Sequence, residues 1–267
     1  MNNLKIFCVT NLPSSKLEKL NLTLAGVGKN DFSNNYINCK NGDNIEFKEQ
    51  YYSELTFHYW FWKNKLAEYS DDIWIGFCQK RRFWLKDNNL NIKNFEDLNN
   101  NILRKVPGEW EKFDAILCDP IPVSPAKKIK IIKRGWKNIL KDPEIFFNKN
   151  KQTIKLHFDM HHGYGILDKA IDVMNIKDRE EFRNFVNNKL KFSPHIMFIS
   201  KKKIMNKWFH SLFDWLSECE KVFGFKNLNG YDQGRLYAYL SERYLPFWFE
   251  KYCKVKFGPW SFFDTEV

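Results

Sequence analysis

Several features that would assign a chain to a well-defined class are missing from these 267 residues. The six cysteines form no Cys-x-x-Cys pair, which excludes the common structural zinc sites and favours reduced core thiols over a disulfide framework. No run of 18 apolar residues occurs, so no segment is predicted to cross a membrane. The first ten residues lead into a strand without the apolar region of a signal peptide, and we expect a cytoplasmic protein.

The glycine motifs of three large enzyme classes are also absent. The chain has no Gly-x-Gly-x-x-Gly, no Gly-x-x-x-x-Gly-Lys-Ser/Thr and no Gly-x-Ser-x-Gly. The first motif lets a backbone approach a dinucleotide, the second surrounds phosphates, and the third exposes a nucleophilic serine. Their absence argues against Rossmann dehydrogenases, P-loop enzymes and α/β-hydrolases.

Acidic residues are in deficit: 32 stand against 43 Lys and Arg, for a net charge of +11. A positive surface predicts an anionic partner, which would be nucleic acid, an anionic membrane surface or a phosphorylated small molecule. The Lys excess is densest in residues 127–155 and 201–207.

The order of apolar segments predicts an α/β fold. Strands are expected at residues 5–10, 73–78, 113–118 and 195–200, with helices between and after them. No repeat or low-complexity linker divides the chain, so we predict one domain over 1–267, with a mobile loop at about 124–156.

The strand expected at residues 73–78 ends in three cations, Lys80, Arg81 and Arg82. Ligands of open α/β sheets bind beyond the carboxyl ends of strands. Arg presents a planar, permanently charged group that matches phosphate oxygens. The pattern therefore predicts a phosphate site, and the alternative is a solvated basic loop.

Three other segments carry residues suited to chemistry. Glu54 is a candidate ligand-binding group, or else it simply begins a helix. In an extended segment His157, Asp159 and His161 would share one face and would hold a divalent metal, contact a substrate, or form an ordinary polar loop. Asp232 lies where a loop opens a helix, which suits a general base, and the alternative is helix capping. Glu242 precedes Arg243, which suits an ion pair.

Together these segments resemble a known family, the glycosyltransferase-like proteins of bacterial capsular and exopolysaccharide gene clusters, catalogued as a domain of unknown function. The resemblance spans about residues 4–250. It is carried by Cys8-Val9-Thr10, Tyr52-Ser53-Glu54-Leu55-Thr56, Tyr59-Trp60-Phe61-Trp62-Lys63-Asn64, Gly76-Phe77-Cys78-Gln79-Lys80-Arg81-Arg82-Phe83-Trp84, His195-Ile196-Met197-Phe198-Ile199-Ser200-Lys201-Lys202 and Leu240-Ser241-Glu242-Arg243.

The sequence departs from the family pattern at two places. The family's His-Tyr before the Arg pair is Gln79-Lys80 here, and its Asn before Met-Phe-Ile is His195. A role for the family histidine therefore cannot be transferred, whereas the Arg pair can.

The resemblance implies a single GT-A-like α/β domain whose sheet is mixed, mostly parallel and flanked by helices. It implies a hexosyl transfer from a nucleotide-diphosphate donor to a growing surface polysaccharide or lipid-linked glycan. The resemblance favours a UDP-sugar as donor, which in some relatives is UDP-galactofuranose. Thr10, Glu54, Arg81 and Arg82 would bind the donor, and Asp159, His161 and His162 would contact the acceptor or diphosphate. Asp232 would be the base, with Glu242 as its competitor.

Related folds hold a metal on the diphosphate with an Asp-x-Asp motif at a comparable strand end. Because cations stand there in this sequence, we expect no cofactor and no metal site, with Mn²⁺ or Mg²⁺ as the alternative. We also expect contact with an anionic membrane at its inner face and no nucleic-acid partner. Two rival functions remain: a basic nucleic-acid-binding protein, and a metal-dependent hydrolase using residues 157–162.

Overall fold

A computed structural model of the chain describes residues 3–88, 90–123 and 128–266, without the side chains of 128–131 and 231. Its internal contacts divide it into two compact units. Unit 1 comprises residues 1–119, 195–210 and 248–267, and unit 2 comprises residues 120–194 and 211–247. The expectation of one domain over 1–267 stays a prediction, because two compact units can still fold as one.

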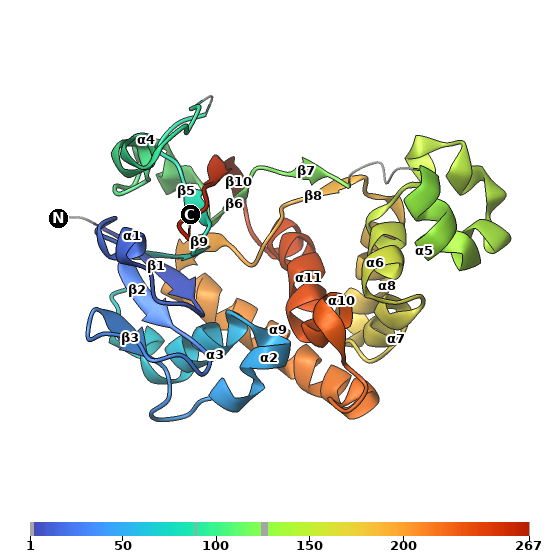
Figure 1. Cartoon of the computed structure of the whole chain (residues 1–267), viewed down its shortest axis with the longest axis horizontal. Helices are drawn as coiled ribbons and strands as arrows, with labels where there is room; N and C mark the ends of the chain where they lie inside the picture. The colour runs from blue at the N-terminus through green and yellow to red at the C-terminus, as the bar shows by residue number, and fades with distance from the viewer. Residues whose placement is uncertain (1–2, 89, 124–127, 267) are drawn as a thin grey trace. The chain divides into compact units, whose positions relative to one another are not determined.

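Unit 1 contains the main sheet. Its strand order is β10-β6-β9-β4-β1-β2-β3, and β1, β2 and β3 lie side by side at the blue end of the chain in Figure 1. All neighbouring pairs are parallel except those of β9, which runs antiparallel to both β4 and β6. The strands are β1 (Leu4–Thr10), β2 (Thr23–Gly26), β3 (Tyr36–Asn38), β4 (Trp74–Gln79), β6 (Ala115–Cys118), β9 (Phe198–Lys201) and β10 (Val255–Gly258), with a side pair β5 (Arg82–Trp84) and β11 (Trp260–Phe262).

Strand β4 lies at the centre of this sheet because its sequence can be buried throughout. All six residues of Trp-Ile-Gly-Phe-Cys-Gln are buried, as expected for a strand covered on both faces. Gly76 in this strand faces Ile199 of β9. A Cβ at position 76 would lie 2.6 Å from Cγ1 of Ile199, so only glycine fits there without displacing that side chain.

Aromatic side chains join the sheet of unit 1 to helix α3. The ring of Phe7 on β1 lies 4.9 Å from that of Phe61 and 6.0 Å from that of Phe77 on β4. Such ring pairs add to the free energy of apolar burial. The helices of unit 1 are α1 (Ser15–Glu18), α2 (Glu49–Tyr52), α3 (Leu55–Asn64), α4 (Phe95–Asn101) and the first part of α9 (Lys202–Phe223), with 3-10 turns η1 (Glu46–Lys48), η2 (Leu66–Glu68) and η3 (Gly108–Lys112).

Unit 2 is mainly helical. Its core includes Trp215, whose Nε1 donates to the carbonyl of Ala170 (2.7 Å), and Tyr244, whose hydroxyl donates to Asp178 (3.0 Å). Its elements are α5 (Lys128–Lys141), α6 (Ile154–His162), α7 (Ile166–Asp172), α8 (Ile176–Asn188), α10 (Gly230–Gly234), most of α11 (Leu236–Tyr252), the later part of α9, the strand pair β7 (Ile121–Pro122) and β8 (Lys191–Phe192), and 3-10 turns η4 (Pro143–Phe146) and η5 (Lys149–Lys151).

Two predictions about local structure need correction. The loop expected at about 124–156 contains α5, η4, η5 and the start of α6, while residues 124–127 lie outside the described residues. Residues 157–162 were expected to be extended but belong to α6, because Thr153 caps a helix there and accepts a hydrogen bond from Leu156 N. Strands β2 and β3 were not among the strands expected from the sequence. None of the helices built from described residues is long and apolar enough to cross a bilayer.

Candidate functional site

The basic turn, Lys80 to Arg82, lies at the carboxyl end of β4 beside the end of β1. The two strands are parallel, with Val9 opposite Gln79, and Lys80 N donates to the carbonyl of Val9 (3.2 Å). Arg82 donates from Nη1 to Oε1 of Gln79 (3.2 Å). The structure thus brings Thr10, Arg81 and Arg82 to one edge of the sheet. Ligands of open α/β sheets bind at this edge, beyond the carboxyl ends of parallel strands.

A neighbouring segment, residues 263–266, supplies carboxylates to this turn. Glu266 forms an ion pair with Lys80, and Oδ2 of Asp264 lies 3.8 Å from Nη1 of Arg81. Backbone and hydroxyl bonds hold the segment in place, since Phe263 N donates to the carbonyl of Arg81 (3.0 Å) and Thr265 donates to that of Lys80 (2.7 Å). Sequence reasoning missed these acids. Their only signal was an Asp-Thr-Glu stretch of charge opposite to the turn.

Thr10 and Glu54 occupy different local settings. The Thr10 hydroxyl donates to the carbonyl of Leu12 (2.5 Å) and accepts from Leu12 N (3.0 Å), so it shapes the loop after β1. Glu54 stands at the N-terminal end of α3, and its side chain makes no capping hydrogen bond. Glu54 therefore begins the helix, as one alternative expected, although its side chain does not cap it, and a ligand role stays a prediction.

A second group of side chains forms in unit 2 around Arg243 on α11. Arg243 is only 2% exposed, forms an ion pair with Glu242, and donates from Nη2 to Nδ1 of His157 (3.3 Å). Its guanidinium also lies 4.3 Å from the ring centroid of Phe192. His157 and His161 are four residues apart on α6, so their rings share a face and lie 4.6 Å apart. Asp159 does not share that face, which removes the basis for a His-Asp-His metal ligand set.

Asp232 joins this group through its backbone and its side chain. Nδ1 of His162 donates to the carbonyl of Asp232 (2.8 Å), and the His162 ring stacks on Tyr239 at 3.8 Å. Arg134 on α5 donates to Oδ2 of Asp232 (3.1 Å) and approaches Nδ1 of His161 (3.4 Å). The structure therefore brings together four predicted residues: His161, His162, Asp232 and Glu242. Of the residues that connect them, His157 was predicted as part of the 157–162 cluster, whereas Arg134 and Arg243 were not predicted as site residues.

Burial keeps two of these histidines uncharged. Burial, followed by the positive charge of Arg243, lowers the pKa of His157 to about 3. The same two causes lower the pKa of His162 to about 4, although its bond to the Asp232 carbonyl acts in the opposite direction. At neutral pH His157 and His162 are therefore neutral imidazoles that can accept or donate hydrogen bonds. They lie in one group with two guanidinium side chains and two acidic side chains, Arg134, Arg243, Asp232 and Glu242.

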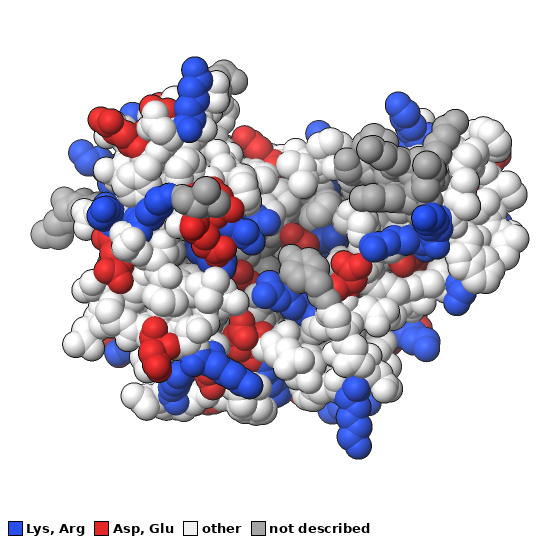
Figure 2. All heavy atoms as spheres, viewed as in Figure 1, with Lys and Arg blue, Asp and Glu red and all other residues white. Residues whose placement is uncertain are grey.

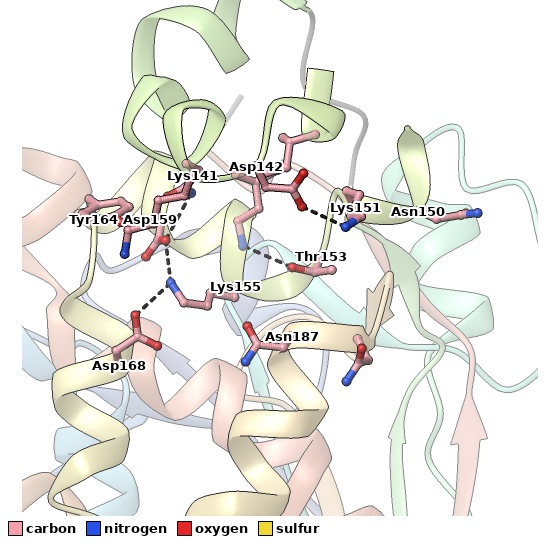
Figure 3. A pocket seen from close by; sticks show the side chains of 14 residues that line it. Lys141, Asp142, Asn150, Lys151, Thr153, Lys155, Asp159, Tyr164, Asp168 and Asn187 are labelled. Atoms are coloured by element: carbon pink, nitrogen blue, oxygen red, sulfur yellow. Dashed lines mark hydrogen bonds and ion pairs between the residues drawn. The ribbon is translucent and has the colours of Figure 1, made fainter. Parts of the chain in front are cut away.

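Asp159 lies apart from the Arg243 group, on the floor of a polar pocket of about 520 Å³ in unit 2. It is buried and accepts hydrogen bonds from Lys155 (2.7 Å), Asn138 (3.2 Å) and Gly165 N (3.1 Å). Figure 3 shows Lys155 between Asp159 and Asp168, to which it also pairs (3.0 Å). Among these described residues charge is largely balanced, so the pocket offers amide, hydroxyl and carboxylate groups suited to a polyhydroxyl ligand.

The donors at the basic turn do not fit a divalent metal, because Lys80, Arg81 and Arg82 are cations and cannot ligate one. Across the described part of the chain, no three His, Cys, Asp or Glu side chains gather in a metal-binding arrangement. That the activity needs no metal stays a prediction.

Positive charge is dispersed over the surface that Figure 2 shows. There the blue Lys and Arg side chains are interspersed with red Asp and Glu side chains and do not merge into one patch. A nucleic-acid-binding protein normally gathers its cations along the path of the phosphates. This face gives the nucleic-acid alternative no support.

Comparisons with known proteins agree with the resemblance seen in the sequence. Residues 7–253 match the family described as a domain of unknown function, DUF4422. A solved structure, the apo form of the bifunctional glycosyltransferase WbbM, superimposes with a TM-score of 0.71 at 21% identity, over 98% of this chain and 45% of that chain. Among curated proteins none matches significantly. The likeness confirms the predicted GT-A-like fold, and the chain spans less than half of WbbM.

Proposed function

We propose that this chain, which belongs to the DUF4422 family, is a glycosyltransferase that moves a hexosyl group from a nucleotide-diphosphate sugar to a glycan. The observation that carries the proposal is the fold shared with WbbM over nearly the whole chain. The cationic turn at the carboxyl end of β4 supports it independently, because a departing nucleoside diphosphate needs positive charge at such a place.

The basic turn is the proposed donor site. Arg81 and Arg82 bind the diphosphate oxygens, while Thr10 and Glu54 line the nucleotide pocket. Because Arg81 pairs with Asp264 at 3.8 Å, its guanidinium is already held near the strand end before a donor arrives. The family resemblance favours a UDP-sugar, with UDP-galactofuranose the first donor to test.

The Arg243 group is the proposed source of acid–base chemistry. Asp232 removes the proton from the acceptor hydroxyl while that oxygen bonds to the anomeric carbon and the sugar–phosphate bond breaks, which suits an inverting displacement. Arg134 positions the Asp232 carboxylate through a 3.1 Å hydrogen bond. His161 and His162 contact the acceptor or the diphosphate, and the contact of Glu242 with Arg243 suits a structural ion pair.

The polar pocket around Asp159 is the proposed binding place for acceptor sugars, because its amides and paired carboxylates can exchange hydrogen bonds with hydroxyl groups. The acceptor is a growing surface polysaccharide or a lipid-linked glycan. An acceptor of that kind requires the enzyme to work in the cytoplasm at an anionic membrane surface.

A donor screen tests the function. Purified full-length protein is incubated with UDP-, dTDP- and GDP-sugars, and release of the nucleoside diphosphate is measured with and without oligosaccharide acceptors. Thermal stability with UDP, single-stranded oligonucleotides, Mn²⁺ and Mg²⁺ is measured in parallel, since a nucleotide at 100 times Kd adds about 2.7 kcal/mol to the free energy of unfolding. Stabilisation by an oligonucleotide alone, with no donor turned over, would contradict the proposal.

A further inference from the structure

Helix α5 exposes a row of large apolar side chains. Ile132, Trp136 and Leu140 are 52%, 51% and 74% exposed. They are spaced four residues apart, so they form one stripe along the helix. Large apolar side chains in a contiguous exposed stripe usually mark an interaction surface, whereas isolated ones are common.

A row of lysines runs beside this stripe, and each lysine directly follows one residue of the stripe in the sequence. Lys133, Lys137 and Lys141 are all exposed and have the same four-residue spacing. The helix carries no acidic residue, and its basic residues are Lys128, Lys130, Lys133, Arg134, Lys137 and Lys141.

Other residues of α5, outside the stripe, attach the helix to unit 2. Asn138 is buried and donates to Asp159 (3.2 Å), and Ile139 packs on the cluster of Ile145, Leu156 and Met160. Because these contacts hold the helix, the apolar stripe is not needed for the core of the unit. It remains available to an outside partner.

We propose that α5 docks this protein onto an anionic lipid bilayer, lying in the plane of the interface with the Ile132–Trp136–Leu140 stripe among the acyl chains. Membrane-surface helices combine an apolar face containing Trp or Leu with a Lys-rich polar face. The adjoining lysines match anionic headgroups. A protein partner fits less well, because the cores of protein interfaces are depleted in Lys. The docking of α5 rests on the proposed function in one respect only, which is that it places a lipid-linked acceptor at the same membrane surface.

Vesicle sedimentation with the full-length protein tests the docking. Wild type is expected to pellet with phosphatidylcholine vesicles that contain about 30 mol% phosphatidylglycerol and to stay in the supernatant with pure phosphatidylcholine, with salt weakening the binding. The double variant Trp136→Ser/Leu140→Ser should bind about tenfold more weakly or worse. Ile176→Ser is the matched control, because Ile176 is an 80% exposed apolar residue on α8 of the same unit, and it should bind as wild type.

Three results would overturn the proposal: no binding to anionic vesicles at low salt, wild-type binding by the double variant, or equal loss in Ile176→Ser. A wild-type dimer in sedimentation velocity that becomes a monomer in the double variant would assign the stripe to a second copy instead. Donor turnover is measured without vesicles on the same preparations. Turnover without vesicle binding would reject the docking alone, and vesicle binding without turnover of any donor would reject the transferase function alone.

Discussion

Nη1 of Arg81 lies 3.8 Å from Oδ2 of Asp264, so a cation of the basic turn at the end of β4 is already paired with a carboxylate of the same chain. The neighbouring Lys80 pairs with Glu266 from the same segment. A donor diphosphate would have to share these cations with two carboxylates or displace them.

Replacing Arg81 or Arg82 with Ala should slow sugar transfer. Loss of one preorganised charge at the leaving diphosphate costs about 2–4 kcal/mol of transition-state stabilisation. Arg→Lys should restore little, since an ammonium group cannot make the bidentate contact. kcat/KM with saturating acceptor measures the effect, and Lys86→Ala, at a lysine after β5, is the control. Full activity in both Ala variants, with folding intact, would remove the turn from the mechanism.

Neutralising the opposing acids should strengthen donor binding. In Asp264→Asn/Glu266→Gln the cations lose their internal partners, so the affinity for a nucleoside diphosphate should rise several-fold. Partly exposed ion pairs of this kind contribute about 0–1 kcal/mol each, so stability should change little. Isothermal titration with UDP at low salt measures the affinity. A weaker affinity would mean that the carboxylates help to bind the donor.

Asp232→Asn should separate binding from chemistry. The amide keeps the shape but cannot take the acceptor proton, so transfer should fall by about 10²–10⁴ while donor binding survives. Single-turnover transfer and UDP titration report the two quantities. Near wild-type transfer would exclude Asp232 as the base.

Glu242→Gln should act mainly on stability. It leaves the buried Arg243 without its carboxylate, and breaking such a pair costs about 3 kcal/mol. Urea unfolding measures the loss. Catalytic failure in a stably folded Glu242→Gln protein would make Glu242 the base instead.

Stability should fall as the pH drops below about 6.5. The pKa values of His157 and His58 are lowered to about 3 and that of His162 to about 4 in the folded chain, mainly by burial. The unfolded chain therefore binds more protons between about pH 6.5 and pH 3–4, and each group lowers the free energy of unfolding by up to about 1.4 kcal/mol per pH unit there. Urea midpoints across this range measure it.

The His157→Gln variant should reduce that pH slope, while His210→Gln, at an exposed histidine, should not. Gln keeps an acceptor for Arg243 and removes the titrating group. An unchanged slope in His157→Gln would mean that its burial is not what limits stability in acid.

Chelation should leave activity intact. In the proposed mechanism Lys80, Arg81 and Arg82 would supply the positive charge that a metal provides where an Asp-x-Asp motif ends the strand. Turnover is measured in EDTA and again after Mn²⁺ or Mg²⁺ is added. If EDTA stops turnover and metal restores it, a metal acts on the donor.

The fold was largely predictable, because apolar runs identify central strands directly. The six buried residues of β4 read as a strand, and the alternation of strands and helices indicated the mostly parallel sheet. The extended segment predicted at residues 157–162 was wrong, since alternating His and Asp suits a strand as well as a helix. The cap by Thr153 and the apolar partners of α6 decide the outcome, and these depend on the tertiary structure.

The candidate site was predictable by residue type but not by grouping. The structure joins His161, His162, Asp232 and Glu242 through Arg243, Arg134 and His157, and the sequence did not indicate that grouping. Arg243 was predicted only as the ion-pair partner of Glu242, and its burial was not predicted. Contacts between residues 86 positions apart, such as Arg243 and His157, have no signal in one sequence. The site roles themselves stay predictions.

Gly76 shows that a short motif can mix two kinds of constraint. Gly76 lies four residues before Lys80 and belongs to the same sequence motif as the basic turn. Glycine is nevertheless required there for a steric reason, because Ile199 of β9 occupies the space that a side chain at position 76 would need. In a saturation-mutagenesis map, loss of function on substitution of Gly76 would therefore reflect the spacing of two strands. Loss of function on substitution of Arg81 would reflect its chemical role. A smaller residue at position 199 should rescue substitutions of Gly76 but not those of Arg81, which would tell the two causes apart.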